Sequence, residues 1–270
     1  MWRRLAAVVM AVVGLLTVLG AAVAPAQAQT LPPPPKRHAL LIGIDEYKEI
    51  PRLEKAVGDA EALAAALKSF GYEVTLAKNP GRRELGETLA RFLARIEQDD
   101  TVLVHYSGHG VEIEQQNFLL PADMPKLPAD LGRAAADFVR NEAMPVSDLM
   151  QRVSMTPAAV RIFILDACRD NPLAVGGVRS IGRRRGLNTQ EPVPAGTFVL
   201  YSAGIGQQAL DNLGPTDKET TSVYTRVLLR QLKRDSSLAG IAQEVRRDVA
   251  AMARRVGHLQ SPAYYDEFIG

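Results

Sequence analysis

Short apolar runs recur along this chain at intervals that suit an α/β fold. Four of them are rich in β-branched and aromatic residues: "HALLIGI" (38–44), "TVLVHYS" (101–107), "RIFILD" (161–166) and "TFVLYS" (197–202). A fifth run, "YEVTLA" (72–77), alternates between polar and apolar residues. Runs of this length and composition predict β-strands, and the most apolar ones are typical of strands buried in a parallel sheet.

Between the strands, apolar residues fall at helical spacing. The first predicted helix has Asp59 as its N-cap, Gly71 just past its end, and an apolar face made of Ala60, Leu63, Ala64 and Leu67. A second carries Leu85, Leu89, Phe92, Leu93 and Ile96 on one face, and further helical patterns cover 146–153, 223–232 and 241–256. Strands that alternate with such helices predict a three-layer α/β/α sandwich around a mainly parallel sheet of about six strands.

The N-terminal 28 residues have the features of an export signal. A basic start is followed by an uncharged run over residues 5–24, and Ala26-Gln27-Ala28 forms a small-x-small cleavage site. We therefore expect a signal peptide over 1–28 and an exported protein, periplasmic or secreted, of a bacterial envelope. The alternative is an uncleaved membrane anchor, because about 20 apolar residues can span a bilayer.

A proline-rich segment separates the predicted signal from the first strand. The run "TLPPPPKR" favours an extended polyproline conformation. We therefore expect a spacer over residues 29–37 and a single catalytic domain over 38–270.

Composition limits the classes of partner. Hydrophobic residues make up 47% of the 270 residues, which is typical of a globular protein with a large core. The 32 basic and 30 acidic side chains leave a formal net charge of +2, so no overall field favours nucleic acid. Neither glycine-rich phosphate loop of the common nucleotide-binding sheets occurs in the sequence.

Cys168 is the single cysteine of the chain, and it lies two residues past the strand 161–166. A lone cysteine in an exported protein cannot form an internal disulfide; it is an intermolecular bridge, a reactive thiol or an inert buried residue. His109 follows the strand 101–107 in the same way and stands between two glycines. Open parallel sheets build active sites at the carboxyl ends of their strands, so the two side chains are candidates for one site.

Several segments together resemble a known family. They are "ALLIGIDEY", "VGDAEALAAAL", "YSGHG", "FLLPAD", "FILDACRDNP" and "FVLYSAG", in that order between residues 38 and 206. His109 precedes Cys168 by 59 residues, near the roughly 50 of the caspase pattern. The chain resembles the caspase-like cysteine peptidases, in their metacaspase and bacterial orthocaspase branch. The resemblance implies the caspase-like form of the α/β/α sandwich.

The resemblance also implies the catalytic groups. Cys168 would be the nucleophile of a Cys-His dyad, with His109 as general base and then general acid. The backbone N–H groups of Gly110 and Cys168 would stabilise the oxyanion. The family requires no third member of a triad.

Substrate specificity follows from the same comparison. Metacaspases cut after Arg or Lys with an acidic pocket, and the matching positions here are Asp59, Ser107 and Asp166. Two carboxylates supply the charge and geometry that a guanidinium favours. The alternative to a pocket role is a purely structural one, in which Asp59 caps its helix and Asp166 ends its strand. We expect protein or peptide substrates with Arg or Lys at P1.

The loop 176–186, "GGVRSIGRRRG", follows the nucleophile where caspases carry their processing linker. A protease specific for basic residues could cut itself at Arg179 or within 183–185. A solvated basic loop that is never cut is the alternative.

No cofactor is predicted. Many metacaspases bind calcium, but the segment after His109 offers only Glu112, Glu114 and Asp123, fewer oxygens than a calcium ion takes. His38, His105 and His258 look incidental. The sequence leaves two rival functions open: a non-catalytic envelope scaffold or binding module, and an acyl transfer other than proteolysis.

Overall fold

A six-stranded sheet forms the middle layer of the computed structural model, which describes residues 34–128, 134–167, 187 and 192–268. Its strand order is β2-β1-β3-β7-β8-β9. The bounds are β1 Arg37–Gly43, β2 Glu73–Lys78, β3 Thr101–Ser107, β7 Val160–Asp166, β8 Thr197–Tyr201 and β9 Ala263–Asp266. The first five strands are parallel to their neighbours, and β9 pairs antiparallel with β8. The predicted mainly parallel sheet is confirmed.

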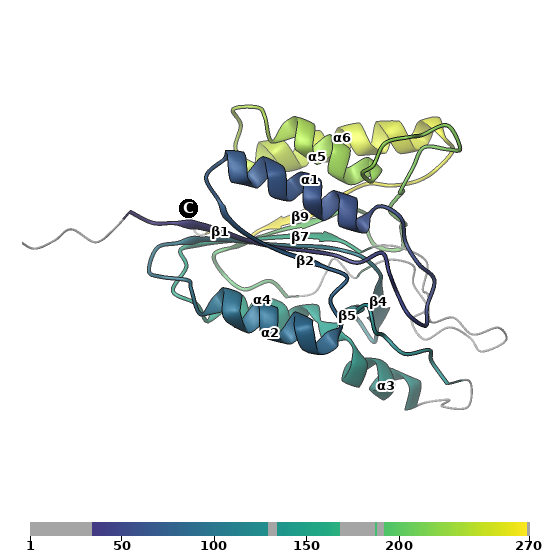
Figure 1. Cartoon of the computed structure of the whole chain (residues 1–270). Coiled ribbons are helices and arrows are strands. Elements are labelled where there is room, and N and C mark those ends of the chain that lie inside the picture. The colour runs from purple at the N-terminus through teal and green to yellow at the C-terminus, as the bar shows by residue number, and fades with distance from the viewer. Residues whose placement is uncertain (1–33, 129–133, 168–186, 188–191, 269–270) are drawn as a thin grey trace, which may run out of the picture. The chain divides into compact units, whose positions relative to one another are not determined.

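Helices cover both faces of this sheet (Figure 1). One face carries α1 Ala56–Ser69, α5 Val223–Gln231 and α6 Leu238–Arg255, and the other carries α2 Arg82–Leu93 and α4 Val146–Ser154. Successive strand residues enter different cores: Leu40 packs in the core under α2 and α4, and Leu41 packs in the core under α1, α5 and α6. This two-sided burial explains why the strands read as unbroken apolar runs.

A small second sheet was not predicted. It consists of β4 Gly110–Ile113, β5 Gln116–Leu119 and β6 Met144–Pro145 in antiparallel order, with α3 Ala135–Glu142 beside it in the chain. These strands have four, four and two residues. Segments so short carry too few positions for an alternating pattern to be read.

The start of α1 corrects one expectation. Asp59 is not the N-cap; it lies within the first turn and is buried. The carboxylate of Asp45 accepts hydrogen bonds from the backbone N–H groups of Ala56 at 2.8 Å and Val57 at 3.0 Å. The helix is therefore capped by a residue that precedes it by eleven positions, which a search for a local capping residue does not reveal. Gly71, with φ of 80°, follows the helix as predicted.

The N-terminal predictions fall outside the described residues. The compact unit that carries the sheet runs from Pro35 to Gly270, whereas the predicted signal and most of the spacer lie before residue 34. Among the residues that the structure describes, no helix has the length and apolar character of a membrane span.

Candidate active site

The carboxyl ends of β3 and β7 lie side by side. Their register pairs Ser107 with Asp166, and His109 and Cys168 each follow by two positions. Paired residues of β3 and β7 are thus 59 positions apart in the sequence, and His109 and Cys168 are also 59 positions apart. Cys168 itself lies outside the described residues; its neighbour Ala167 is described and buried.

Close backbone packing brings the His109 segment against Ala167. The Gly108 N–H donates to the Asp166 carbonyl at 3.2 Å. A Cβ atom at Gly110 would lie 2.8 Å from the Ala167 carbonyl oxygen and 3.0 Å from the Ala167 Cβ, so a side chain at that position would clash with the backbone. The structure thus places the predicted base next to the residue that is peptide-bonded to the predicted nucleophile.

The imidazole of His109 has a defined orientation. Its Nε2 lies 2.8 Å from the Pro51 carbonyl oxygen, and its ring centroid lies 4.7 Å from that of Tyr47. A carbonyl oxygen only accepts hydrogen bonds, so neutral His109 carries its proton on Nε2. Nδ1 is then the nitrogen that can accept a proton, as a general base requires.

Two tyrosines that the sequence analysis did not single out hold the backbone of His109. The His109 N–H donates to the Tyr47 hydroxyl at 2.7 Å, and the Tyr106 hydroxyl donates to the His109 carbonyl at 2.7 Å. A Cβ atom at Gly108 would lie 2.7 Å from both hydroxyl oxygens, so glycine is needed there. Both tyrosines belong to motifs quoted above, "ALLIGIDEY" and "YSGHG", so the sequence did carry a signal for them.

The three predicted pocket residues meet in one cluster beside this site. Asp59 from α1 accepts a hydrogen bond from the Ser107 hydroxyl at 3.1 Å and another from the Ser222 backbone N–H at 2.7 Å. The Ser222 hydroxyl donates to Asp166 Oδ2 at 2.9 Å. All four residues are at most 1% exposed. The face toward α1 and α5 therefore holds a buried acidic cluster, which the sequence predicted except for Ser222.

Ser222 was missed, although it carries a recognisable local signal. It is the N-cap of α5, and its hydroxyl accepts from the Thr225 N–H at 3.1 Å. A serine ahead of an apolar helical pattern indicates such a cap. Its contact with Asp59 spans 163 residues, and no local pattern reports a contact of that range.

One carboxylate oxygen of the acidic cluster has no hydrogen-bond donor among the described residues. Asp166 Oδ1 is buried and accepts no hydrogen bond from any residue that the structure describes. A buried carboxylate oxygen without a donor is unfavourable, whereas a cationic donor such as a guanidinium would satisfy it.

An ion pair holds the loop before α5 against the start of that helix. Arg226 Nη1 donates to Asp217 Oδ2 at 2.8 Å, and Arg226 Nη2 donates to the Thr221 carbonyl at 2.7 Å. Burial disfavours the charged form of Asp217, but Arg226 and the N–H groups of Leu213 and Glu219 outweigh it and lower the pKa to about 2. Arg226 therefore also holds Thr221, the residue immediately before Ser222.

We expect Asp217→Asn to lower the free energy of unfolding by about 1–3 kcal/mol at pH 7. The folded pKa is depressed from 3.8, so the stabilisation by the carboxylate is complete above about pH 4 and is lost as the pH falls toward 2. Urea unfolding of both proteins at pH 7, 4 and 3 measures the difference. If the difference in unfolding free energy between the two proteins stayed constant down to pH 3, or grew, the Asp217 carboxylate would not stabilise the fold in this way.

The other histidines have structural surroundings. His38 lies within β1, which starts one residue before the predicted run 38–44; its ring nitrogens lie 3.5 Å from Glu73 and 3.2 Å from Asp100. Burial lowers the pKa of His105 to about 3, so its ring is neutral at physiological pH. His258 Nε2 lies 2.8 Å from the Gln208 carbonyl oxygen.

The candidate calcium ligands have protein partners. Glu112 accepts from the Gln115 N–H at 2.6 Å, and Glu114 forms an ion pair with Arg140. Asp123 accepts from the Arg82 N–H at 2.7 Å at the start of α2. Among the described parts of the chain, no group of three His, Cys, Asp or Glu side chains is placed to hold a metal ion. The absence of a cofactor remains a prediction.

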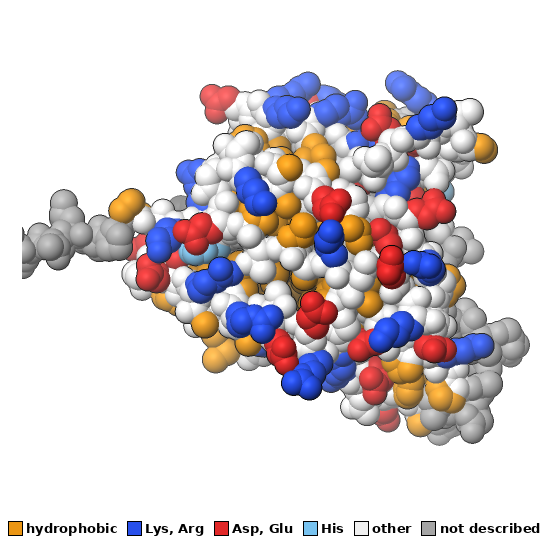
Figure 2. All heavy atoms as spheres, in the orientation of Figure 1, with side chains coloured by type: hydrophobic (Ala, Val, Ile, Leu, Met, Phe, Trp, Pro, Cys, Tyr) orange, Lys and Arg blue, Asp and Glu red, His pale blue; other side chains and the backbone are white. Residues whose placement is uncertain are grey.

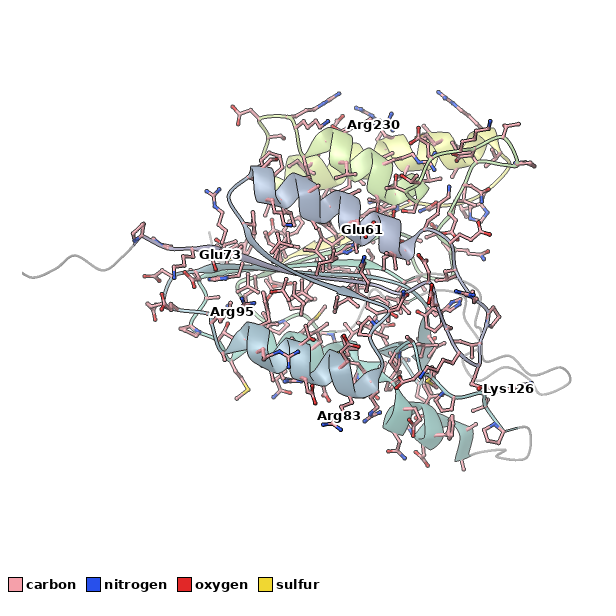
Figure 3. The ribbon with its side chains drawn as sticks, viewed as in Figure 1. Glu61, Glu73, Arg83, Arg95, Lys126 and Arg230 are labelled. Carbon is pink, nitrogen blue, oxygen red and sulfur yellow. The ribbon has the colours of Figure 1, made fainter. Side chains whose placement is uncertain are left out.

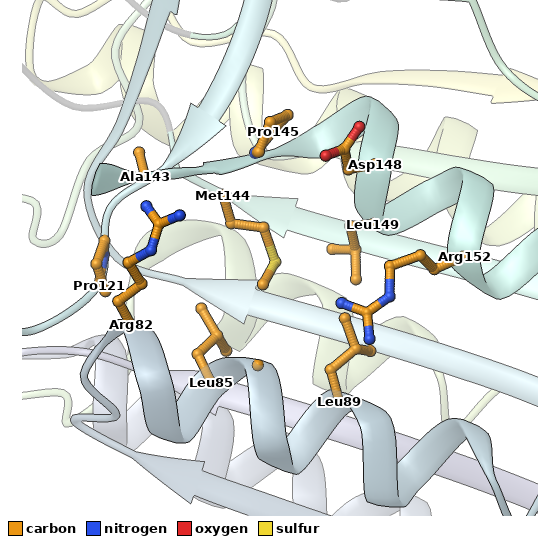
Figure 4. Close-up of a pocket in the computed structure, with 11 residues that line it drawn as sticks. Arg82, Leu85, Leu89, Pro121, Ala143, Met144, Pro145, Asp148, Leu149 and Arg152 are labelled. Carbon is orange, nitrogen blue, oxygen red and sulfur yellow. The ribbon is translucent and has the colours of Figure 1, made fainter. Parts of the chain in front are cut away.

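A separate pocket of about 220 Å³ lies between α2 and α4 (Figure 4). Leu85, Leu89 and Leu149 are among its apolar lining, with Arg82 and Arg152 at its two sides. It lies on the face of the sheet opposite the acidic cluster, and none of the candidate site residues lines it.

Comparisons with known proteins agree with this architecture. The family model described as "Caspase domain" matches residues 36–269. "Mucosa-associated lymphoid tissue lymphoma translocation protein 1" of Homo sapiens and its homolog of Mus musculus are each 24% identical over 131 residues, 48% of this chain. The chain covers only 15% and 14% of the length of these relatives.

A solved structure has a similar fold. The "structure of pro-sf-caspase-1" matches with a TM-score of 0.58 and 14% identity, over 87% of this chain and 88% of that chain. The caspase-like three-layer sandwich is thereby confirmed. Because the family model spans nearly all of the described sheet and helices, the chain belongs to the caspase domain family of cysteine peptidases.

Proposed function

We propose that this chain is a cysteine endopeptidase that cuts after Arg or Lys. Cys168 is the nucleophile of a dyad with His109, and Asp59, Ser107 and Asp166 form the pocket for the P1 side chain. The observation that carries the proposal is the buried acidic cluster at the sheet edge where His109 lies. Family membership supports the peptidase activity, and the charge of the cluster supports the choice of substrate.

The chemistry follows from the groups present. The Cys168 thiol transfers its proton to Nδ1 of His109 as its sulfur attacks the scissile carbonyl carbon. The tetrahedral intermediate collapses when His109 returns that proton to the leaving amine, which breaks the C–N bond and leaves a thioester. A water molecule then attacks the thioester, with His109 taking its proton and returning it to the sulfur. The peptide acid leaves and the thiol is restored.

Backbone geometry supports Gly110 as an oxyanion donor. The His109 carbonyl faces β5, because it accepts from the Leu120 N–H at 3.0 Å. Alternation along an antiparallel pair then directs the Gly110 N–H away from β5. The Cys168 N–H is the second proposed donor. Two backbone donors aimed at one oxygen stabilise the negative charge that develops there.

The acidic cluster supports a basic P1 residue. A guanidinium that enters beside Asp166 Oδ1 would supply a donor that no described residue provides, and a compensating charge. A P1 aspartate would instead place a third carboxylate next to two buried ones. Arginine should be preferred to lysine, because its planar fork can reach two carboxylate oxygens at once.

Paired fluorogenic peptides that end in Arg, Lys, Ala and Asp test the proposal. We expect Arg and Lys peptides to be cut with kcat/KM at least about 10²-fold above the Asp peptide, since like charges in a desolvated site cost several kcal/mol. The same chain with Cys168→Ala is the control for a contaminating protease. Cleavage after Asp alone, or no cleavage with and without calcium, would refute the proposed specificity or the proposed activity, respectively.

Two further elements of the proposal concern parts of the chain outside the described residues. We propose that the basic loop 176–186 is a site of self-cleavage, because it offers four arginines to an Arg-specific enzyme. We also propose that residues 1–28 direct export and that activity needs no calcium. Intact masses of the active and Cys168→Ala chains, from the peptide assay above, report any self-cleavage directly.

A further inference from the structure

The pocket between α2 and α4 has a glycine in its wall that packing does not require. Gly86 lies inside α2 and lines the pocket. Glycine in a helix interior is less favourable than alanine, because its backbone loses more freedom on folding. A Cβ atom at Gly43 would lie 2.5 Å from the Ala56 carbonyl oxygen, whereas a Cβ atom at Gly86 would have no described atom within 4 Å outside its own stretch of helix. The missing side chain at Gly86 therefore leaves open space in the pocket.

The interior of the pocket is apolar. Leu85 and Leu89 of α2 and Leu149 of α4 line it, and Figure 4 shows the Met144 side chain reaching between the two helices from β6. The other apolar lining residues are Pro121, Ala143 and Pro145. An apolar cavity of about 150 Å³ is large enough to hold benzene, so the volume of about 220 Å³ suits one aromatic ring with a short chain. A methionine sulfur also makes favourable contacts with aromatic rings.

The rim of the pocket carries three charged side chains. Arg82 and Arg152 lie at its two sides, and Asp148 belongs to the first turn of α4. All three are exposed, and none forms an ion pair with a described residue. The position of Asp148 has a structural reason, because a carboxylate in the first turn stabilises a helix. Two guanidiniums and one carboxylate leave the rim with one excess positive charge.

The other arginines of α2 have an acidic partner. Arg83 lies 2.9 Å and Arg91 lies 3.7 Å from a carboxylate oxygen of Glu87. Figure 2 shows acidic and basic side chains next to one another over this part of the surface, and Figure 3 shows Arg83 projecting from α2 away from the sheet. Within α2, the arginine without an ion pair to a described residue is thus the one that lines the pocket, Arg82.

We infer that this pocket binds a small molecule with one aromatic ring and one carboxylate group. The ring lies against Met144 and the leucines, in the space that Gly86 leaves open. The carboxylate reaches the rim, where a guanidinium offers two parallel N–H donors. One negative charge on the ligand balances the excess positive charge of the rim, which a neutral or cationic ligand does not. None of the residues involved belongs to the candidate active site.

An NMR titration of the full chain carrying Cys168→Ala with hydrocinnamate, a benzene ring joined to a carboxylate by a short chain, tests this binding. We expect a dissociation constant of about 1 mM or tighter, as for ligands of this size. Hydrocinnamamide has the same shape without the charge and should bind at least about fivefold more weakly, because charge-assisted hydrogen bonds are about twice as strong as neutral ones. No binding of hydrocinnamate, or equal binding of the acid and the amide, would overturn the assignment.

Charge variants test the role of the rim in the same titration. The double variant Arg82→Gln/Arg152→Gln removes both guanidiniums and should weaken hydrocinnamate binding at least about tenfold. Asp148→Asn removes the opposing charge and should strengthen binding about two- to threefold. Arg83→Gln/Arg91→Gln is the matched control, because it removes the same two charges from α2 outside the pocket. Equal weakening by the two double variants would show that the rim does not hold the carboxylate.

Two substitutions of Gly86 test the open space. Alanine and leucine both favour a helix over glycine, so Gly86→Ala and Gly86→Leu should each raise the melting temperature by about 2–4 °C. Leucine also fills the pocket and should weaken hydrocinnamate binding at least about tenfold, whereas alanine takes up little volume and should weaken it less than about threefold. Unchanged binding in Gly86→Leu would place the ligand elsewhere, and a lower melting temperature would show that the pocket lacks this space; either result would refute the assignment.

Discussion

Cleavage of Arg-ending peptides is expected to disappear in Cys168→Ala and to fall at least about 10³-fold in kcat in His109→Gln. Alanine has no nucleophile, so no thioester can form. Glutamine preserves a polar side chain of similar reach, but it cannot accept the thiol proton and return it to the leaving amine. Initial rates and active-site titration with a thiol-reactive probe measure the two effects.

The environment of His109 sharpens this prediction. The Pro51 carbonyl fixes the proton on Nε2, and Tyr47 and Tyr106 hold the backbone on both sides of the ring. In the neutral ring, Nδ1 is therefore the nitrogen that can accept a proton. His258→Gln is a matched control, because it removes a histidine whose ring contacts the Gln208 carbonyl instead of a candidate site residue. Retention of more than a tenth of the activity in His109→Gln would exclude His109 as the base.

Asp166→Asn is expected to lower kcat/KM for the Arg peptide by about 10²–10³-fold, while the Ala peptide changes less than threefold. Loss of one partner from a buried charge pair costs about 2–5 kcal/mol. The asparagine keeps the shape and can still contact the Ser222 hydroxyl, so the pocket should survive. Steady-state kinetics with both peptides measure the change in selectivity.

The two peptides separate a pocket role from a folding defect. A general defect would lower both rates together, and it would also slow alkylation of Cys168. Asp235→Asn is a suitable control, since it removes an exposed carboxylate that lines a pocket with Arg37 and Phe70, at the amino ends of the strands. An equal loss on the Arg and Ala peptides would show that Asp166 supports the site without binding the P1 side chain.

Much of the sheet could be predicted because burial on both faces leaves a local signature. The run "TVLVHYS" coincides with β3, and "RIFILD" differs from β7 by one residue. The β4–β5–β6 sheet and β9 left no such signature, because their strands have four residues or fewer. The cap of α1 was misplaced for a related reason: it is supplied by Asp45, which lies outside the local window.

The amino-acid sequence is enough to predict the family, the main strands and helices along the chain, and the candidate groups at the carboxyl ends of the strands; the order of the strands within the sheet came from the structure. The quoted motifs, taken in their order, nominate Asp59, Ser107, His109, Asp166 and Cys168 as candidates. How the described members of this set are held follows only from the packing of elements far apart in the chain. Ser222 joins Asp59 to Asp166 across 163 and 56 residues, and Tyr47 reaches His109 across 62. Such contacts arise when helices pack on the sheet, and no periodicity of hydrophobic positions encodes them.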